Sequence, residues 1–231
     1  MASAAYDQWH KEHHTGQGPW YDMATQLLAA HPELLTDARV LEIGCGWGDF
    51  AAWMASRGAR SVVGEDFSGV AIEIARSRHK GVGVQFNVGD IEHIAHPAET
   101  FDLVVSCETI EHVRNPSVAV KELARVLSPD GTLLLSTPNY LSITGAHRVF
   151  REATGRKWDE GGQPFVGWTM YPRTAAWVRR AGLAVVSTHG DGWYLPVPRR
   201  PGGLPLRPPP WLERWVKLGA VHILMEAHKP L

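Results

Sequence analysis

The chain contains 231 residues, 44% of them hydrophobic and 20% charged, with a formal net charge of −1 at pH 7. This length suits one α/β domain with additional segments, and the composition is that of an ordinary globular protein. The neutral balance gives no indication of nucleic-acid binding, and no run of about 18 apolar residues predicts a membrane-spanning helix.

The cysteine content indicates a reducing environment. Only two cysteines, Cys45 and Cys107, occur in the chain. They do not form the dense disulfide framework of a small secreted domain. Residues 1–14 also lack the apolar core of a signal peptide. We therefore expect a cytoplasmic protein.

Helix and strand patterns alternate along most of the chain, after a polar and aromatic stretch at residues 1–19. A turn is expected at 128–131, where Ser-Pro-Asp-Gly separates two such patterns. Alternating strands and helices predict a parallel sheet with right-handed crossovers. The expected helices are 20–30, 49–57, 69–79, 117–127 and 173–181, and the expected strands are 39–43, 61–64, 82–88, 101–106, 132–136, 183–188 and 222–227.

Two segments interrupt this alternation and are interpreted as insertions, one near 138–168 and one near 190–221. The first is rich in glycine, polar and aromatic residues, and the second is rich in proline and arginine. Within the second, residues 211–216 have the pattern of a short amphipathic helix. A stiff connector or a lid is favoured for this segment, with peripheral membrane contact through 193–216 as the alternative.

The most informative motif is a glycine loop that follows the first expected strand. Gly44, Gly46 and Gly48 alternate, which differs from the G-x-G-x-x-G spacing of dinucleotide sites. Glu42 lies two residues before the first glycine. A carboxylate there would repel a pyrophosphate at the helix N-terminus and would suit an ammonium group. S-adenosylmethionine carries that ammonium, together with a ribose diol and no phosphate.

Acidic residues follow the next two strands as well. Glu65 and Asp66 end the second strand, about 20 residues after the glycine loop, where a carboxylate accepts hydrogen bonds from ribose hydroxyls. Asp66 fits this spacing. After the third strand, Asp90 is placed to accept from an adenine amino group, while Ile91 packs on the ring.

The order of these parts resembles the class I S-adenosylmethionine-dependent methyltransferases over residues 36–137. Glu65 departs from that pattern, because an apolar residue usually precedes the ribose acid. The resemblance implies a Rossmann-like α/β fold with a seven-stranded, mainly parallel sheet of order 3-2-1-4-5-7-6, an antiparallel last strand and helices on both faces. Residues 36–231 would form this domain, and residues 1–35 a cap over the cofactor and acceptor sites.

The resemblance also implies the cofactor site. Six residues match the family's cofactor motifs one by one, and four neighbours are expected to contact the same cofactor. The matching residues are Glu42, Gly44, Gly46, Gly48, Asp66 and Asp90, and the neighbours are Cys45, Phe67, Ile91 and Cys107.

Glu108, Glu111 and His112 follow the fourth strand and are the candidate catalytic residues. If a helical turn begins near Cys107, they lie at i, i+3 and i+4 on one face. Two carboxylates and an imidazole suit Mg²⁺, Mn²⁺ or Fe²⁺. Without a metal, His112 could act as a general base, since imidazole titrates near neutral pH. A purely structural role, with a capping glutamate and a packed histidine, is the third interpretation.

The E-x-x-E-H pattern resembles ubiquinone-biosynthesis O-methyltransferases and small-RNA 2′-O-methyltransferases, where these residues are associated with a divalent metal. Residues 136–139 and 168–169 are also similar to the small-RNA enzymes. Those enzymes add a histidine before the tryptophan, whereas residues 163–167 here contain none. No Asn-Pro-Pro-Tyr follows the fourth strand, which weighs against N-methylation of nucleic-acid bases.

The sequence therefore predicts a methyltransferase that uses S-adenosylmethionine to methylate a small-molecule acceptor at a hydroxyl oxygen, with a divalent cation as a candidate second cofactor. A nucleic-acid partner is not expected. Two alternatives stay open: a metal-assisted RNA 3′-end 2′-O-methyltransferase, and a non-catalytic cofactor-binding partner subunit.

Overall fold

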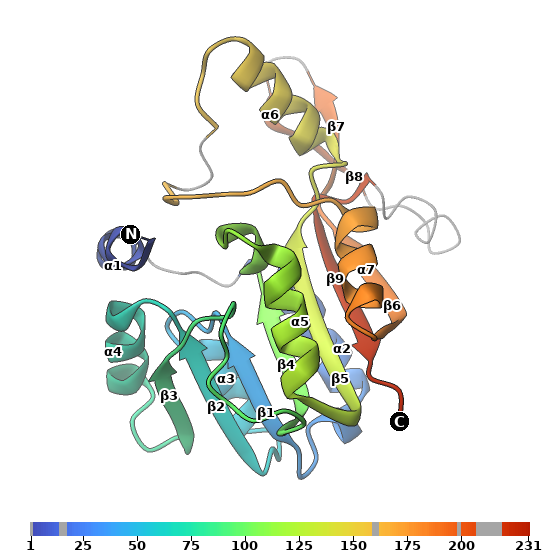
Figure 1. Cartoon of the computed structure of the whole chain (residues 1–231). Helices are drawn as coiled ribbons and strands as arrows, with labels where there is room; N and C mark the ends of the chain where they lie inside the picture. Colours follow the sequence, from blue (N-terminus) through green and yellow to red (C-terminus); the bar gives the residue numbers. More distant parts are fainter. Residues whose placement is uncertain (1, 14–17, 159–161, 198–199, 207–218) are drawn as a thin grey trace.

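The computed structural model describes residues 2–13, 18–158, 162–197, 200–206 and 219–231. A seven-stranded sheet of order β3-β2-β1-β4-β5-β9-β6 forms its centre (Figure 1). All pairings are parallel except those of β9, which runs antiparallel to β5 and β6. This arrangement confirms the expected 3-2-1-4-5-7-6 order. The strands are β1 (Arg39–Ile43), β2 (Ser61–Asp66), β3 (Val84–Val88), β4 (Phe101–Cys107), β5 (Leu127–Pro138), β6 (Ala184–Asp191) and β9 (His222–His228).

Helices cover both faces of the sheet because successive strand side chains point to opposite faces and both sets are apolar. Val40 of β1 joins the hydrophobic cluster under α2, α3 and α4, whereas Leu41 and Ile43 join the cluster under α5 and α7. Figure 1 shows α5 and α7 in front of the sheet and α2 and α3 behind it. The helices are α1 (Ala2–Glu12), α2 (Pro19–Ala30), α3 (Asp49–Ala55), α4 (Gly69–Arg78), α5 (Pro116–Val126), α6 (Ile143–Ala153) and α7 (Tyr171–Arg180), with short 3₁₀ turns η1 (Pro32–Leu34) and η2 (Ile110–His112).

The two expected insertions contain secondary structure of their own. The first holds α6, and the second holds β7 (Trp193–Val197) and β8 (Arg200–Leu206), which pair as a separate two-stranded sheet. Both project beyond the main sheet (Figure 1). The amphipathic helix predicted at 211–216 lies outside the described residues. Within the described ranges, no helix combines the length and apolarity needed to cross a membrane.

The prediction that a turn at 128–131 separates two elements is wrong. Residues 127–138 form one strand, and the Ser-Pro-Asp-Gly sequence is accommodated as a bulge within it. Phe101 pairs with Leu127 and Leu103 with Thr132, so the pairing jumps across the bulge. Asp130 takes a left-handed conformation with φ of 62°. The turn residues are therefore present, but they bend a strand instead of ending one.

An ion pair joins the first residue of β1 to β4 near the amino ends of these strands. Arg39 Nη2 lies 2.7 Å from Asp102 Oδ1, and Arg39 Nε and its backbone N–H both donate to Oδ2 at 3.0 and 2.8 Å. These hydrogen bonds to the Arg39 guanidinium lower the pKa of Asp102 to about 2. The pair links β1 to β4 at this end of the sheet.

Asp102→Asn is expected to destabilise the fold at neutral pH. The side chains of the pair are 39% and 41% exposed, so we expect a loss of about 1 kcal/mol instead of the full value of the pKa shift. Because the folded pKa is depressed, this contribution is present above the ordinary aspartate pKa and is lost as the pH falls toward about 2. Urea unfolding at several pH values tests this: the gap between wild type and variant should narrow as the pH falls from about 5. A gap that widens instead would contradict the assignment.

Candidate functional site

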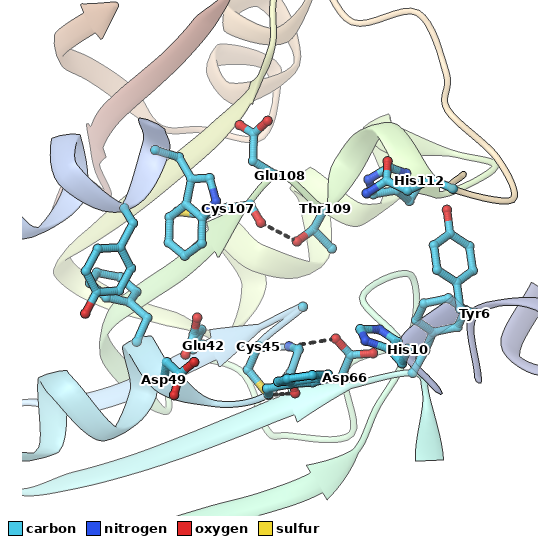
Figure 2. A pocket seen from close by; sticks show the side chains of 18 of the residues that line it. Tyr6, His10, Glu42, Cys45, Asp49, Asp66, Cys107, Glu108, Thr109 and His112 are labelled. Atoms are coloured by element: carbon cyan, nitrogen blue, oxygen red, sulfur yellow. Dashed lines mark hydrogen bonds between the residues drawn. The ribbon is translucent and has the colours of Figure 1, made fainter. Parts of the chain in front are cut away.

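A cavity of about 350 Å³ lies at the carboxyl ends of β1, β2 and β4 (Figure 2). The order of the strands reverses between β1 and β4, and ligands of open α/β sheets bind at such a point. Nine of the residues predicted from the sequence line the cavity: Glu42, Gly44, Cys45, Gly46, Asp66, Phe67, Cys107, Glu108 and His112. Four others, Gly48, Asp90, Ile91 and Glu111, are outside its lining.

The glycine loop is held tightly against β2 and β4. The backbone N–H groups of Gly44 and Cys45 both donate to the Glu65 carbonyl, at 2.7 and 2.9 Å. Gly44 has φ of 81°, and a β-carbon there would come 2.1 Å from Thr109 Oγ1. Glycine is thus required at this position both by the backbone conformation and by the close approach of Thr109.

Gly48 has a different role. It is the N-cap of α3 with φ of 78°, and a β-carbon there would lie 2.5 Å from the ring of Phe86. This glycine lets α3 begin close to β3. The close packing of α3 against β3 therefore explains why the third residue of the motif is a glycine.

Asp66 faces the cavity, whereas Glu65 points elsewhere. Gly46 N–H donates to Asp66 Oδ2 and Ser68 N–H to Oδ1, both at 2.9 Å. Burial raises the pKa of Asp66, although these hydrogen bonds and His10 oppose the shift. Each carboxylate oxygen keeps a second lone pair that can accept from a ligand hydroxyl. Glu65 Oε1 instead lies 2.9 Å from His96 Nε2, outside the lining of the cavity.

Glu42 is a buried carboxylate that lines the cavity. It is 3% exposed, and its Oε2 atom has no hydrogen-bond partner among the described residues. Burial raises its pKa well above the ordinary value, and nearby Asp66 and Asp49 add to the effect. A buried carboxylate oxygen without a partner is costly unless a ligand satisfies it. An ammonium group would satisfy it and would favour the ionised form.

The two residues predicted to contact adenine, Asp90 and Ile91, lie outside the lining of the cavity. Asp90 has a 61% exposed side chain, and its Oδ1 accepts from the Glu92 N–H. Ile91 is buried in the hydrophobic cluster beneath α5. Neither Asp90 nor Ile91 therefore lines the cavity. Phe67, in the loop after β2, does line it and offers an aromatic ring next to Asp66 in the sequence.

Glu108 occupies the end of β4 in a strained conformation. Its φ is 48°, a left-handed value that is rare for residues other than glycine. Ser136 Oγ donates to its Oε1 at 2.8 Å, and His222 Nδ1 lies 3.0 Å from its Oε2. Strain of this kind persists where the surroundings over-determine it, often at functional sites. The carboxylate is therefore held in one orientation at the cavity wall.

The helical turn predicted to start near Cys107 is wrong, because the 3₁₀ turn η2 begins only at Ile110. Glu111 is 1% exposed, and its Oε2 accepts from Thr137 Oγ1 at 3.1 Å. His112 Nδ1 lies 2.7 Å from the Phe165 carbonyl. Since a carbonyl only accepts, Nδ1 carries a proton, and Nε2 lies 3.6 Å from Glu111 Oε1.

Two of the three expected metal ligands approach each other, with His112 Nε2 3.6 Å from Glu111 Oε1, but Glu108 has other partners. Glu108 contacts Ser136 and His222, whereas Glu111 contacts Thr137. Across the described part of the chain, no group of three or more His, Cys, Asp or Glu side chains is placed to hold a metal ion. The arrangement thus does not fit the predicted Glu108–Glu111–His112 metal site.

Several lining residues were not predicted individually. Tyr6, Trp9 and His10 come from α1, Trp20 and Tyr21 from α2, and Gln163 from the segment after α6. The aromatic content of residues 1–19 was the only signal for the first group. His222 was missed as a partner of Glu108, although an antiparallel last strand starting there places it at this edge of the sheet, opposite Pro138.

Comparison with known proteins identifies the family. A family model described as a methyltransferase domain matches residues 41–135. The ubiquinone biosynthesis O-methyltransferase of Xanthomonas axonopodis pv. citri (strain 306) is 34% identical over 162 residues, covering 66% of this chain and 65% of that protein. The protein of the same name from Neisseria meningitidis serogroup A / serotype 4A (strain DSM 15465 / Z2491) is 33% identical over 170 residues, covering 70% of each. The chain thus spans about two thirds of the length of these relatives.

A solved structure supports the fold assignment. The crystal structure of an S-adenosylmethionine dependent methyltransferase from Mesorhizobium loti matches with a TM-score of 0.63 at 19% identity, covering 88% of this chain and 96% of that one. At this identity the match concerns the fold alone. Together with the sequence relatives, and with a cavity where the glycine loop and Asp66 meet, it leads to one conclusion. The chain belongs to the class I S-adenosylmethionine-dependent methyltransferases.

Proposed function

We propose that this protein transfers a methyl group from S-adenosylmethionine to a hydroxyl oxygen of a small molecule. The observation that carries the proposal is that Glu42, Asp66 and Glu108 line the same cavity. The first two suit a ligand with an ammonium and a diol, and the third offers a fixed carboxylate beside it. The relatives named for ubiquinone biosynthesis favour a small acceptor over the RNA alternative.

The residues present fit the cofactor. Glu42 would hold the ammonium, Asp66 the ribose hydroxyls and Phe67 the adenine ring, while Gly44 and Gly46 let the backbone approach closely. Asp90 and Ile91 do not line the cavity, and their contact with adenine stays a prediction. When bound, S-adenosylmethionine supplies a methyl group made electrophilic by its sulfonium.

The protein's own task is then to position the acceptor oxygen, exclude water and accept a proton. Aromatic side chains of α1 and α2 line the cavity, which supports residues 1–35 as a cap that excludes water. Glu108 and His112 line the same cavity and are the proposed proton acceptors. Glu111 supports η2, because its backbone carbonyl accepts from the Gly167 N–H at 2.6 Å.

Calorimetry followed by a methyl-transfer assay tests the function. We expect S-adenosylmethionine and S-adenosylhomocysteine to bind in a one-to-one ratio, and NAD to give no measurable heat. Turnover should then appear for members of a panel of hydroxylated metabolites and not for their deoxy counterparts. Binding without turnover on any hydroxylated acceptor would favour the cofactor-binding subunit, and transfer to RNA 3′ ends would favour the RNA enzyme.

Asp66→Ala is expected to weaken S-adenosylhomocysteine binding at least about 10-fold, because it removes a buried charged acceptor. Glu65→Ala should change the affinity less than about threefold, since Glu65 pairs with His96 away from the cavity. Calorimetry on both variants measures the difference, with thermal unfolding to confirm that each is folded. A larger loss at Glu65 would show that the ribose acid has been assigned one residue too late.

A further inference from the structure

His10 is a buried imidazole in the wall of the cavity, contributed by α1. The residue is 5% exposed, and Figure 2 shows its ring beside the carboxylate of Asp66. The ring of Trp9 packs against it edge-on, with 5.0 Å between the centroids. His10 matches none of the family motifs quoted above, and the proposed reaction does not yet use it.

The Nδ1 atom of His10 is enclosed and has no hydrogen-bond partner among the described residues. Leaving a buried ring nitrogen unpaired costs about 1–3 kcal/mol. Burial lowers the pKa of His10, although Asp66 and Asp7 act in the opposite direction. The ring is therefore neutral at pH 7 and offers one donor and one acceptor nitrogen.

The helix that carries His10 is anchored to the segment that directly follows Asp66. Asp7 Oδ1 accepts from Ser68 Oγ at 2.6 Å and from the Val70 N–H at 3.3 Å, at the start of α4. The Tyr6 ring meets the Phe67 ring edge-on at 4.9 Å. These contacts fix His10 relative to Asp66 and Phe67 instead of leaving it on an independent arm.

The two side chains are chemically complementary toward a vicinal diol. Ionised Asp66 can only accept, and it already receives the N–H groups of Gly46 and Ser68. A diol carries two O–H donors and two acceptor oxygens. A neutral imidazole beside the carboxylate supplies the donor or second acceptor that Asp66 alone lacks.

We propose that His10 is a cofactor-binding residue that hydrogen-bonds the ribose hydroxyls of S-adenosylmethionine beside Asp66. This inference rests on the proposed function. It makes α1 part of the cofactor site itself, in addition to its covering role.

Calorimetry with S-adenosylhomocysteine and its 2′-deoxy and 3′-deoxy analogues tests the proposal. His10→Ala should weaken binding of S-adenosylhomocysteine about 10-fold, the effect of one buried hydrogen bond. The loss should disappear for the analogue that lacks the contacted hydroxyl, as in a double-mutant cycle. His10→Gln, which can place a polar nitrogen near the position of Nε2, the ring nitrogen that is not enclosed, should retain most of the affinity. Lys11→Ala, an exposed change on the same helix, is the control.

Each outcome decides the question. An equal loss on all three ligands would mean that His10 only packs, and an unchanged affinity would mean that it does not contact the cofactor. Either result overturns the proposal while leaving the function intact. If the wild-type protein fails to bind S-adenosylhomocysteine, the proposed function itself fails. Asp7→Asn keeps the His10 side chain but weakens the anchor that positions α1, so this variant should show part of the same loss of affinity.

Discussion

Gly44→Ala is expected to reduce the affinity for S-adenosylmethionine by at least about 100-fold, a loss of about 2.7 kcal/mol. The new β-carbon would lie 2.1 Å from Thr109 Oγ1, and the backbone has φ of 81°. Either Thr109 moves into the cavity or the loop moves away from β4. Both responses disturb the Gly44 and Gly46 backbone that the cofactor approaches. Isothermal titration calorimetry measures the loss.

The matched control is Gly58→Ala. Gly58 also has a left-handed backbone, with φ of 95°, but a β-carbon there meets nothing within 4 Å. It therefore carries the conformational strain of about 1–2 kcal/mol without the collision. We expect lower thermal stability and unchanged affinity in this control. Equal affinity losses in both variants would show that strain, and not the approach of Thr109, determines the result.

Glu108→Gln and His112→Ala are each expected to lower kcat by about 10²–10⁴ while changing cofactor affinity less than about threefold. Both side chains line the cavity next to the cofactor region, and both are held by hydrogen bonds: Glu108 by Ser136 and His112 by the Phe165 carbonyl. A proton acceptor acts mainly in the transition state, so its loss affects turnover more than binding. Steady-state kinetics with the identified acceptor, together with calorimetry, separates the two effects.

His31→Ala removes an exposed imidazole at the end of α2 and should leave kcat unchanged. A chelator provides a second comparison. Activity that is lost with a chelator and restored by Mg²⁺, Mn²⁺ or Fe²⁺ would assign Glu108 and His112 to metal chemistry, against the geometry described above. Full turnover in His112→Ala would reduce His112 to a packed residue and would leave Glu108 as the remaining proton acceptor.

The central sheet could be predicted because its information is local. Val40, Leu41 and Ile43 are all apolar, as a strand buried on both faces requires, and the following glycines and Asp66 end their strands at the expected positions. The glycine loop and Asp66, the proposed ribose-binding residue, could therefore be located from their spacing and from the family resemblance. The bulge at Asp130 could not, since the same four residues would end a strand elsewhere.

The parts that were missed depend on contacts between distant segments. α1 contributes His10 to the cavity because Asp7 binds the start of α4. No local sequence pattern predicts this contact between distant segments. Glu108 is separated from Glu111 by its left-handed backbone, whereas the predicted shared face assumed a regular helix. Sequence spacing thus identified nine residues that line the cavity, but it did not predict how Glu108 and Glu111 are placed relative to each other.

The position of β9 has a consequence for how the protein is made. Although β9 comes after β6 in the sequence, it lies between β5 and β6 and pairs with both. While the ribosome is still synthesising residues 222–228, β5 and β6 have unpaired edges that can associate with other chains. These edges can pair only after synthesis has passed His228, so the nascent chain depends on β9 to cover them.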